Sequence, residues 1–278
     1  MTNSGKYFWR TSRRDLRWSE RPLIMGILNV TPDSFSDGGR FMDPVQAVDR
    51  ALEMEQAGAD IIDLGGESTR PGAQAVDLEE ELRRVMPVLE KLAGTVKVPI
   101  SIDTTKSEVA RRAIDAGVEI VNDVSSGEWD AQLWSVVAEK KAGYVLMHCG
   151  GKPADNFKHA PYGDVTGAVL AYLEKRLVAA AEAGIERERV VCDPGFGFGK
   201  SGAENITLLR ELDRLRAVDR PVLVGLSRKS FLKAICGEEN LGAGTMAAEL
   251  VAALRGAAIW RTHDIGAAAG MASATLGV

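Results

Sequence analysis

Eight short apolar runs of strand length alternate with amphipathic stretches of helix length from residue 23 onward. This alternation is typical of repeated βα units around a parallel sheet. Several of the amphipathic stretches, SEVARRAIDAG among them, end at a glycine, which suits a helix C-cap. The expected strands span residues 23–28, 60–64, 99–103, 119–123, 144–148, 190–193, 222–226 and 258–261. Eight units in a chain of 278 residues predict an α/β fold of the (β/α)8 TIM-barrel type.

The first 21 residues precede the first of these strands and form a separate lead. Tyr7, Phe8, Trp9 and Trp18 stand on either side of a basic TSRR turn, so we expect a hairpin-like segment that caps the bottom of the barrel. No Pro/Ser/Gly linker or shift in composition divides the remainder. The sequence therefore predicts one domain over residues 1–278, with 1–21 as its N-terminal lead.

Composition excludes several classes of protein. The 34 Lys and Arg and 39 Asp and Glu are interspersed and give a net charge of only -5, so we expect no nucleic acid partner. The start of the chain is too polar for a signal peptide, and no apolar run approaches the roughly 18 residues that span a bilayer. We therefore expect no membrane association and a cytoplasmic location. Cys149, Cys192 and Cys236 are too few and too scattered for a disulfide framework or a thiolate metal site, which predicts reduced packing residues.

Polar residues stand at or just past the end of each expected strand. Reactive groups of this fold lie where strands end and βα loops begin. A single Asp, Asn or Ser at such a position commonly caps the following helix, but eight at one rim favour a site. The eight are Asn29, Asp63, Asp103, Asn122, His148, Asp193, Ser227 and Arg261.

Part of this rim suits a flat, polar heterocycle. Asp103 and Asp193 have no adjacent lysine, and a buried carboxylate needs a donor-rich partner such as a 2-aminopyrimidinone edge. Asn122 can donate and accept on another edge of the same ring, and Lys229 can donate to a ring carbonyl or nitrogen. The guanidinium of Arg261 can stack on the ring. The alternative is a general acid and base pair, as in glycoside hydrolysis, which the surrounding Asn, Lys and Arg favour less.

A second group of rim residues suits an anion, and a diphosphate leaving group would fit it. Loops near the last strands of this fold often hold phosphate. The group comprises Asn29, Thr31, Ser68, Thr69, Arg70, Arg261 and His263. An alternative role for each Arg is a surface ion pair. For His263 the alternative is to cap a helix or to lie in the core with its hydrogen bonds satisfied. The role of His148 is left open.

The run GFGFGKS resembles a nucleotide P-loop at its end only. The pattern G-x-x-x-x-G-K-[ST] requires glycine at 194, where this chain has Pro194. The run also fails as a dinucleotide fingerprint, because it follows the sixth strand and no acidic ribose partner matches it. We expect a flexible loop in which Phe198 is an apolar lid.

From about residue 22 to the C-terminus the strand and loop junctions together resemble the dihydropteroate synthase family. They are MGILNVTPDSFSDGG, IIDLGGESTRPG, SIDTTKSE, EIVNDVSSG, VLMHCGG, VCDPGFGFGK, VLVGLSRKS and IWRTHD. The resemblance implies a pterin pocket deep in the barrel, made by Asp103, Asn122, Met147, Asp193, Lys229 and Arg261. It also implies that diphosphate is bound by Asn29, Thr69, Arg261 and His263, with Mg²⁺ on Asn29.

The same resemblance assigns the remaining site residues. It implies that 4-aminobenzoate enters beside Phe35, Thr69, Pro71, Phe198 and Ser227, and that two loops, residues 31–39 and 68–72, close over the reacting centre. The implied catalytic residues are Asn29, Asp33, Asp37, Arg70, Lys229, Arg261 and His263. Two departures are visible: Cys149 where the family more often has Met, and Trp260 where a small aliphatic is usual. By strand alternation Trp260 should point toward the helices.

The implied reaction joins 6-hydroxymethyl-7,8-dihydropterin diphosphate to 4-aminobenzoate and releases diphosphate. A corrinoid methyltransferase using methyltetrahydrofolate shares the pterin-binding barrel but not the SRKS, TPDSFSDGG and ESTRPG segments. A non-catalytic pterin-binding paralogue would keep the pterin contacts and lose the loops. This alternative is disfavoured because the loop residues are intact, namely Asp33, Asp37, Thr69 and Arg70. The family also suggests a homodimer through the C-terminal helices.

Overall fold

Eight parallel strands close into a barrel in the order β10-β3-β4-β5-β6-β7-β8-β9. The computed structural model describes residues 6–18, 21–31, 43–68, 73, 75–151 and 161–275. The strands are β3 (Leu23–Asn29), β4 (Ile61–Gly65), β5 (Ile100–Asp103), β6 (Ile120–Asp123), β7 (Gly143–Met147), β8 (Val190–Asp193), β9 (Val222–Val224) and β10 (Ala257–Thr262). All eight coincide with expected strands, which confirms the predicted barrel. β9 ends two residues earlier than expected, and a turn follows in which Lys229 N donates to Leu226 O and Arg228 has a φ of 56°.

Alternation along the strands separates two apolar cores. Met25, Ile61 and Ile259 belong to the smaller core inside the barrel, and their strand neighbours Ile24, Ile62 and Trp260 belong to the larger core beneath the helices. Trp260 therefore packs toward the helices, as predicted.

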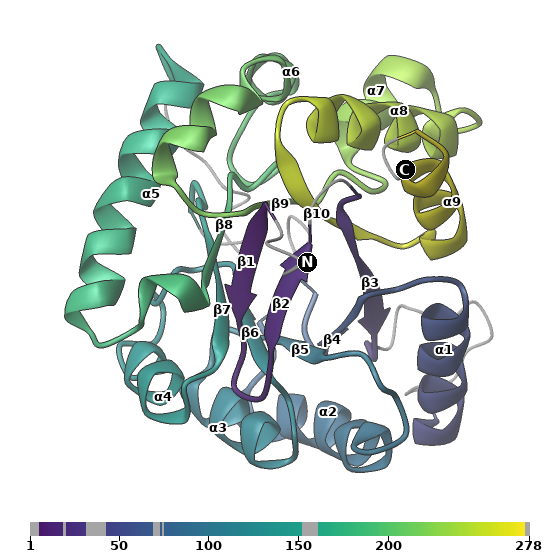
Figure 1. Cartoon of the computed structure of the whole chain (residues 1–278), viewed down its shortest axis with the longest axis vertical. Helices are drawn as coiled ribbons and strands as arrows, with labels where there is room; N and C mark the ends of the chain where they lie inside the picture. Colours follow the sequence, from purple (N-terminus) through teal and green to yellow (C-terminus); the bar gives the residue numbers. More distant parts are fainter. Residues whose placement is uncertain are drawn as a thin grey trace, which may run out of the picture.

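Helices follow the strands and ring the barrel (Figure 1). They are α1 (Pro44–Gln56), α2 (Leu78–Leu92), α3 (Ser107–Asp115), α4 (Leu133–Lys140), α5 (Val165–Glu182), α6 (Gly202–Arg210), α7 (Ser230–Cys236), α8 (Leu241–Leu254) and α9 (Ile265–Thr275), with 3-10 turns η3 (Arg187–Arg189) and η4 (Leu212–Val218). Short polar side chains start several of them: Asp77 caps α2, and Ser201 with Glu204 forms a capping box on α6. These caps fix where the loops before α2 and α6 end, and so which of their residues remain at the mouth.

The N-terminal lead is an antiparallel hairpin of β1 (Tyr7–Arg10) and β2 (Asp15–Trp18), which lies across the barrel in Figure 1. Trp9 and Trp18 are buried in the core inside the barrel. Their indoles donate to Arg189 O at 2.7 Å and to Ala258 O at 3.1 Å. These contacts confirm the predicted cap on the barrel bottom.

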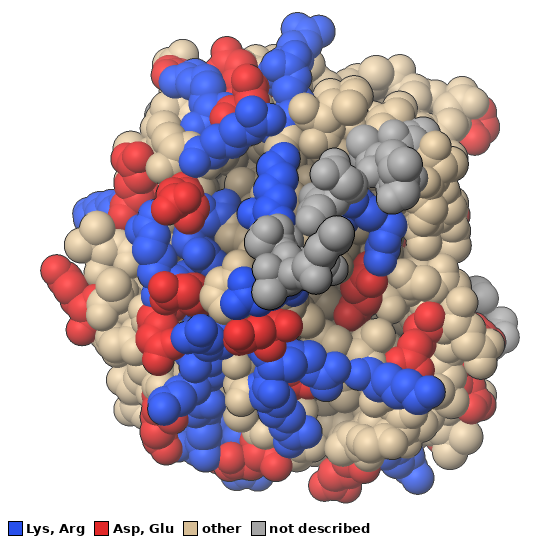
Figure 2. Space-filling view, viewed as in Figure 1, with Lys and Arg blue, Asp and Glu red and all other residues tan. Residues whose placement is uncertain are grey.

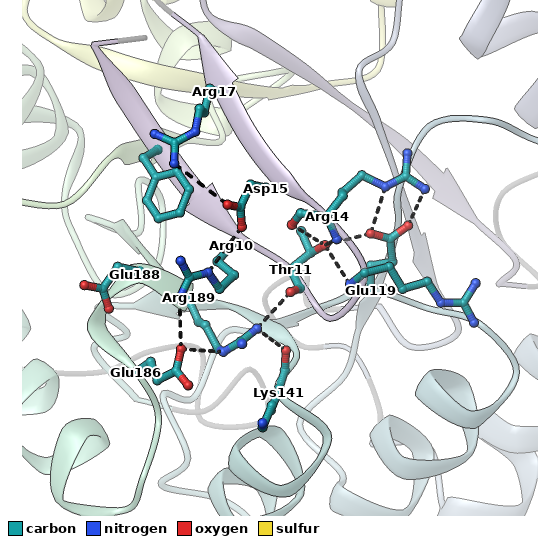
Figure 3. A network of polar contacts seen from close by, with 12 residues as sticks. Arg10, Thr11, Arg14, Asp15, Arg17, Glu119, Lys141, Glu186, Glu188 and Arg189 are labelled. Carbon is teal, nitrogen blue, oxygen red and sulfur yellow. Dashed lines mark hydrogen bonds and ion pairs between the residues drawn. The ribbon is translucent and has the colours of Figure 1, made fainter. Parts of the chain in front are cut away.

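A polar network joins the turn of this hairpin to the barrel (Figure 3). The buried Glu119 carboxylate accepts from Arg14 Nη2 at 2.6 Å and from Thr11 Oγ1 at 2.7 Å, and Arg189 Nη1 donates to Thr11 O at 2.8 Å. Figure 2 shows basic and acidic side chains mixed over this face. The cap is therefore held by burial of apolar side chains and by the Arg14–Glu119 ion pair, in which the Glu119 carboxylate is buried.

Two further expectations concern membrane-spanning helices and the cysteines. Among the described residues no helix is both long enough and apolar enough to cross a membrane. The three cysteines, all within the described residues, are free thiols, as predicted.

Candidate active site

One layer of inward-facing positions at the C-terminal mouth collects several predicted site residues. Strand register pairs Asn29 with Gly65, Gly65 with Asp103, and Asp103 with Asn122, and on the far side it pairs Met147 with Asp193. A Cβ at Gly65 would lie 3.3 Å from Asn29 Oδ1 and 3.5 Å from Asp103 Cβ. The glycine therefore leaves the space in which the Asn29 and Asp103 side chains lie.

Arg261 lies between two carboxylates at this mouth. Its Nε donates to Asp63 Oδ2 at 2.7 Å, and its Nη2 donates to Asp103 Oδ2 at 2.6 Å. From the sequence we expected the Asp103 carboxylate to need a hydrogen-bond donor from a ligand. In the structure Arg261 already donates to one of its two oxygens. Burial raises the pKa of Asp103, and the nearby Asp63 adds to this effect while Arg261 opposes it. Burial alone would lower the pKa of Arg261, but the two carboxylates hold it above its usual value.

Sequence reasoning counted Asp63 among the rim residues at strand ends but assigned it no contact. It lies in the middle of β4 and is fully buried, and the same Oδ2 that binds Arg261 accepts from Asn122 Nδ2 at 3.0 Å. The available signal was strand alternation: residue 63 shares a face with Gly65, and so points inward toward Arg261.

Asp193 and Lys229 form the opposite side of the pocket. Asp193 Oδ1 accepts from the Gly195 N–H at 2.7 Å. Burial raises the pKa of Asp193, opposed by that N–H and by Lys229. Burial lowers the pKa of Lys229 to about 8, opposed by Asp193. The Lys229 ammonium lies 4.3 Å from the centre of the Phe198 ring, so a cation–π contact holds this aromatic beside the pocket.

Lys200, the lysine of the run that resembles a P-loop, turns back onto its own loop. Its Nζ lies 2.8 Å from Gly195 O, 3.2 Å from Phe198 O and 2.9 Å from His148 Nδ1. The side chain is buried, and burial lowers its pKa to about 7. These contacts give Lys200 a structural role in shaping the loop, in agreement with rejection of a nucleotide site, and they give His148 a partner.

Ser227 and His263 connect two parts of the predicted site. The Ser227 hydroxyl lies 2.9 Å from His263 Nδ1, and the His263 backbone N–H donates to the same hydroxyl at 3.3 Å. A residue predicted for the second substrate thus contacts a residue predicted for the leaving group.

Two residues of the predicted anion group, Thr31 and Ser68, are described: Thr31 is buried and Ser68 is half-buried. Six further predicted site residues lie outside the described residues. They are Asp33, Phe35, Asp37, Thr69, Arg70 and Pro71. Within the described part of the chain, no group of three or more His, Cys, Asp or Glu is arranged to hold a metal ion.

The described geometry favours recognition of a polar ring over hydrolysis. Asp103 is ion-paired with Arg261, and Asp193 accepts a backbone N–H, so neither carboxylate is the isolated acid or base that a sugar cleft would need. Carboxylate acceptors, the Asn122 amide and the ammonium of the half-buried Lys229 converge on one mouth. This set matches the donors and acceptors of a flat heterocycle.

Comparisons with known proteins agree with this geometry. A family model described as pterin binding enzyme matches residues 25–263. The dihydropteroate synthase of Synechocystis sp. is 43% identical over 91% of this chain and 88% of its own length. The solved structure of Xanthomonas albilineans dihydropteroate synthase with 4-aminobenzoic acid has 45% identity and a TM-score of 0.89, covering 96% of both chains. That of Yersinia pestis dihydropteroate synthase with a sulfonamide drug has 39% identity and a TM-score of 0.89, covering 96% of this chain and 98% of that one. The chain therefore belongs to the pterin-binding enzyme family and, within it, to the dihydropteroate synthases.

Proposed function

We propose that this chain condenses 6-hydroxymethyl-7,8-dihydropterin diphosphate with 4-aminobenzoate, giving 7,8-dihydropteroate and diphosphate. The observation that carries the proposal is the convergence of buried Asp103, Asn122 and Asp193 with the half-buried Lys229 at the barrel mouth, where Arg261 binds Asp103. A pterin ring presents a complementary set of amino, N–H, carbonyl and ring-nitrogen groups.

The pterin is oriented by the two sides of the pocket. Asp193 Oδ1 is occupied by the Gly195 N–H, so Oδ2 accepts from the pterin 2-amino group and ring N–H. Lys229 donates to the ring carbonyl or nitrogen, and Met147, the register partner of Asp193, contacts the ring. Asp103 keeps Oδ1 for the ligand because Oδ2 is taken by Arg261.

The chemical step needs no protein nucleophile. The bond between the pterin methylene carbon and the diphosphate oxygen breaks, and the electron pair leaves with diphosphate. The resulting cation is stabilised by the buried carboxylates of Asp103 and Asp193. The amine of 4-aminobenzoate then forms the new C–N bond and loses a proton to solvent.

The leaving group lies against Asn29, Thr69, Arg261 and His263 in this proposal. His263 Nδ1 is in contact with Ser227, which fixes the ring beside the pocket, and we assign this imidazole to a phosphate oxygen. The catalytic assignments of Asp33, Asp37 and Arg70, outside the described residues, stay predictions.

Asn29 fits a role as the protein ligand of Mg²⁺. Within the described residues the side-chain amide of Asn29 makes no hydrogen bond, and its Oδ1 faces the space beside Gly65. Mg²⁺ prefers oxygen ligands and is commonly bound by one or two side chains together with substrate phosphates and waters. When bound, Mg²⁺ would draw negative charge from the diphosphate and help it leave.

The second substrate enters beside Phe198 and Ser227, with Phe35, Thr69 and Pro71 contributed by the two loops. The structure of the Xanthomonas albilineans relative contains 4-aminobenzoic acid, which supports this substrate for the present chain. Phe198 offers an aromatic face, and the Ser227–His263 contact supports an entry side next to the leaving group.

Release of diphosphate is the direct test. We expect steady release only when the pterin diphosphate, 4-aminobenzoate and Mg²⁺ are all present, because attack by the amine completes the turnover. Methyl transfer from methyltetrahydrofolate to a corrinoid, without diphosphate release from the pterin substrate, would contradict the proposal and identify the chain as a methyltransferase.

We further propose a homodimer and a cytoplasmic location. Ile235 of α7 and Val251 and Leu254 of α8 are large exposed apolar side chains, which supports contact with a second copy through the C-terminal helices. The free thiols agree with a reducing compartment. Sedimentation of wild type and Leu254→Asp tests the dimer: the variant is expected to sediment as a monomer.

A further inference from the structure

The buried carboxylate of Asp63 contacts two proposed site residues at once. Asp63 is 0% exposed, and its Oδ2 accepts from Arg261 Nε at 2.7 Å and from Asn122 Nδ2 at 3.0 Å. Its Oδ1 has no hydrogen-bond partner among the described residues. Burial of a carboxylate is costly, and these two bonds are its compensation within the described structure.

The bond to Asn122 fixes which end of the amide faces a ligand. An asparagine side chain can turn over and exchange its oxygen and nitrogen at little cost unless a neighbour distinguishes them. Asp63 carries no proton when ionised and accepts only, so it selects the orientation with Nδ2 toward itself. The Asn122 carbonyl oxygen and its second N–H are then presented together to the pocket.

The bond to Arg261 fixes the plane and the charge of the guanidinium. Asp63 holds Nε while Asp103 holds Nη2, and two charge-assisted bonds on different nitrogens define the plane of the group. Two carboxylates also offset the charge of one guanidinium. The proposed reaction develops positive charge on the pterin, which an unpaired arginine beside it would oppose.

We propose that Asp63 is a positioning residue for the pterin, which sets the orientation of the Asn122 amide and the plane and charge of Arg261. This inference rests on the proposed function. Asp63 would then contribute to pterin specificity without touching the ring, because it acts through its hydrogen bonds with Asn122 and Arg261.

Calorimetry of pterin binding to Asp63→Asn tests the inference, with 6-hydroxymethylpterin as the probe. We expect at least about a tenfold loss of affinity for 6-hydroxymethylpterin, equivalent to about 1.4 kcal/mol. The KM for 4-aminobenzoate should change by less than about twofold, because the second substrate contacts other residues. Glu119→Gln is the matched control: it removes a buried carboxylate from an Arg pair at the opposite end of the barrel, and its pterin affinity should equal that of wild type.

A double-mutant cycle separates positioning from a general structural effect. If Asp63 acts partly through Asn122, then Asp63→Asn should cost less pterin affinity in an Asn122→Ala background than in wild type. Equal losses in both backgrounds, or unchanged affinity in folded Asp63→Asn, would overturn the inference. Wild-type protein that fails to bind the pterin at all would instead overturn the proposed function.

A measurement on the wild type covers the case in which Asp63→Asn does not fold. The Arg261 Nε–H is donated to a buried carboxylate, so we expect its NMR signal to exchange with water more slowly than that of the exposed Arg50. Exchange of the Arg261 Nε–H as fast as that of Arg50 would refute the Asp63 contact directly.

Discussion

Replacement of Asp193 with Asn should remove the strongest acceptor of the pterin pocket. Asp193 is buried, and one oxygen is committed to the Gly195 N–H, which leaves one charged oxygen for the ligand. A charge-assisted hydrogen bond contributes about 1.5 to 3 kcal/mol. At about 1.4 kcal/mol per decade, the dissociation constant of a pterin should rise about 10- to 150-fold.

Because of Lys229, the loss of pterin affinity in Asp193→Asn should become larger as pH rises. Burial lowers the pKa of Lys229 to about 8, and Asp193 is the main group that opposes this. Without the Asp193 charge, the pKa of Lys229 falls further, so the ammonium is deprotonated at a lower pH. The affinity of Asp193→Asn should therefore decline between pH 7 and 8 more steeply than that of wild type.

The assay is calorimetry with a pterin that lacks diphosphate, combined with thermal unfolding. Because burial raises the pKa of Asp193, its ionised form is costly in the fold, and Asn should not lower the melting temperature. The control is Asp164→Asn. Asp164 is an exposed cap of α5 where Asn caps equally well, and its exposed ion pair with Arg214 contributes little. Unchanged pterin affinity in folded Asp193→Asn would refute the assignment of this carboxylate.

Three further predictions concern the leaving group, the loop lysine and inhibition. Asn29→Ala should weaken retention of Mg²⁺ and diphosphate while a diphosphate-free pterin binds nearly as well; equal weakening of both ligands in calorimetry would mean that Asn29 only shapes the pocket. Because burial lowers the pKa of Lys200 to about 7, the unfolded chain binds one more proton between about pH 7 and 10. The free energy of unfolding of wild type should therefore rise relative to Lys200→Met by about 1.4 kcal/mol per pH unit in that range, and parallel urea-unfolding profiles would contradict it. Sulfonamides should compete with 4-aminobenzoate, because they share its flat ring and aromatic amine and the TPDSFSDGG and STRPG loops carry no insertion; a sulfonamide in large excess that leaves steady-state turnover untouched would show that the second-substrate pocket is misplaced.

The barrel and its cap could be predicted from the sequence because they depend on local patterns. Strand-length apolar runs fixed the strand positions to within two residues, and the aromatic residues around the TSRR turn indicated the hairpin. Trp260 could be placed by alternation, because successive strand residues face opposite sides. Each of these inferences uses neighbours in the chain.

The pairing of charged groups could not be read in the same way. Arg261 binds Asp63 and Asp103 from positions 198 and 158 residues away along the chain. Which carboxylate an arginine meets is decided by barrel closure and register. The role of Lys200 was missed for a related reason. Two of its partners are carbonyl oxygens of its own loop, whose direction depends on glycines such as Gly195, with a φ of 67°, and the third is the distant His148.

Formation of 7,8-dihydropteroate tests the central claim most directly. Purified chain would be incubated with pterin diphosphate, Mg²⁺ and radiolabelled 4-aminobenzoate, and the labelled product separated by chromatography. The account predicts one labelled dihydropteroate for each diphosphate released, with turnover strongly reduced in Asp193→Asn. Labelled 4-aminobenzoate recovered unchanged by folded wild-type protein that binds the pterin would contradict the account.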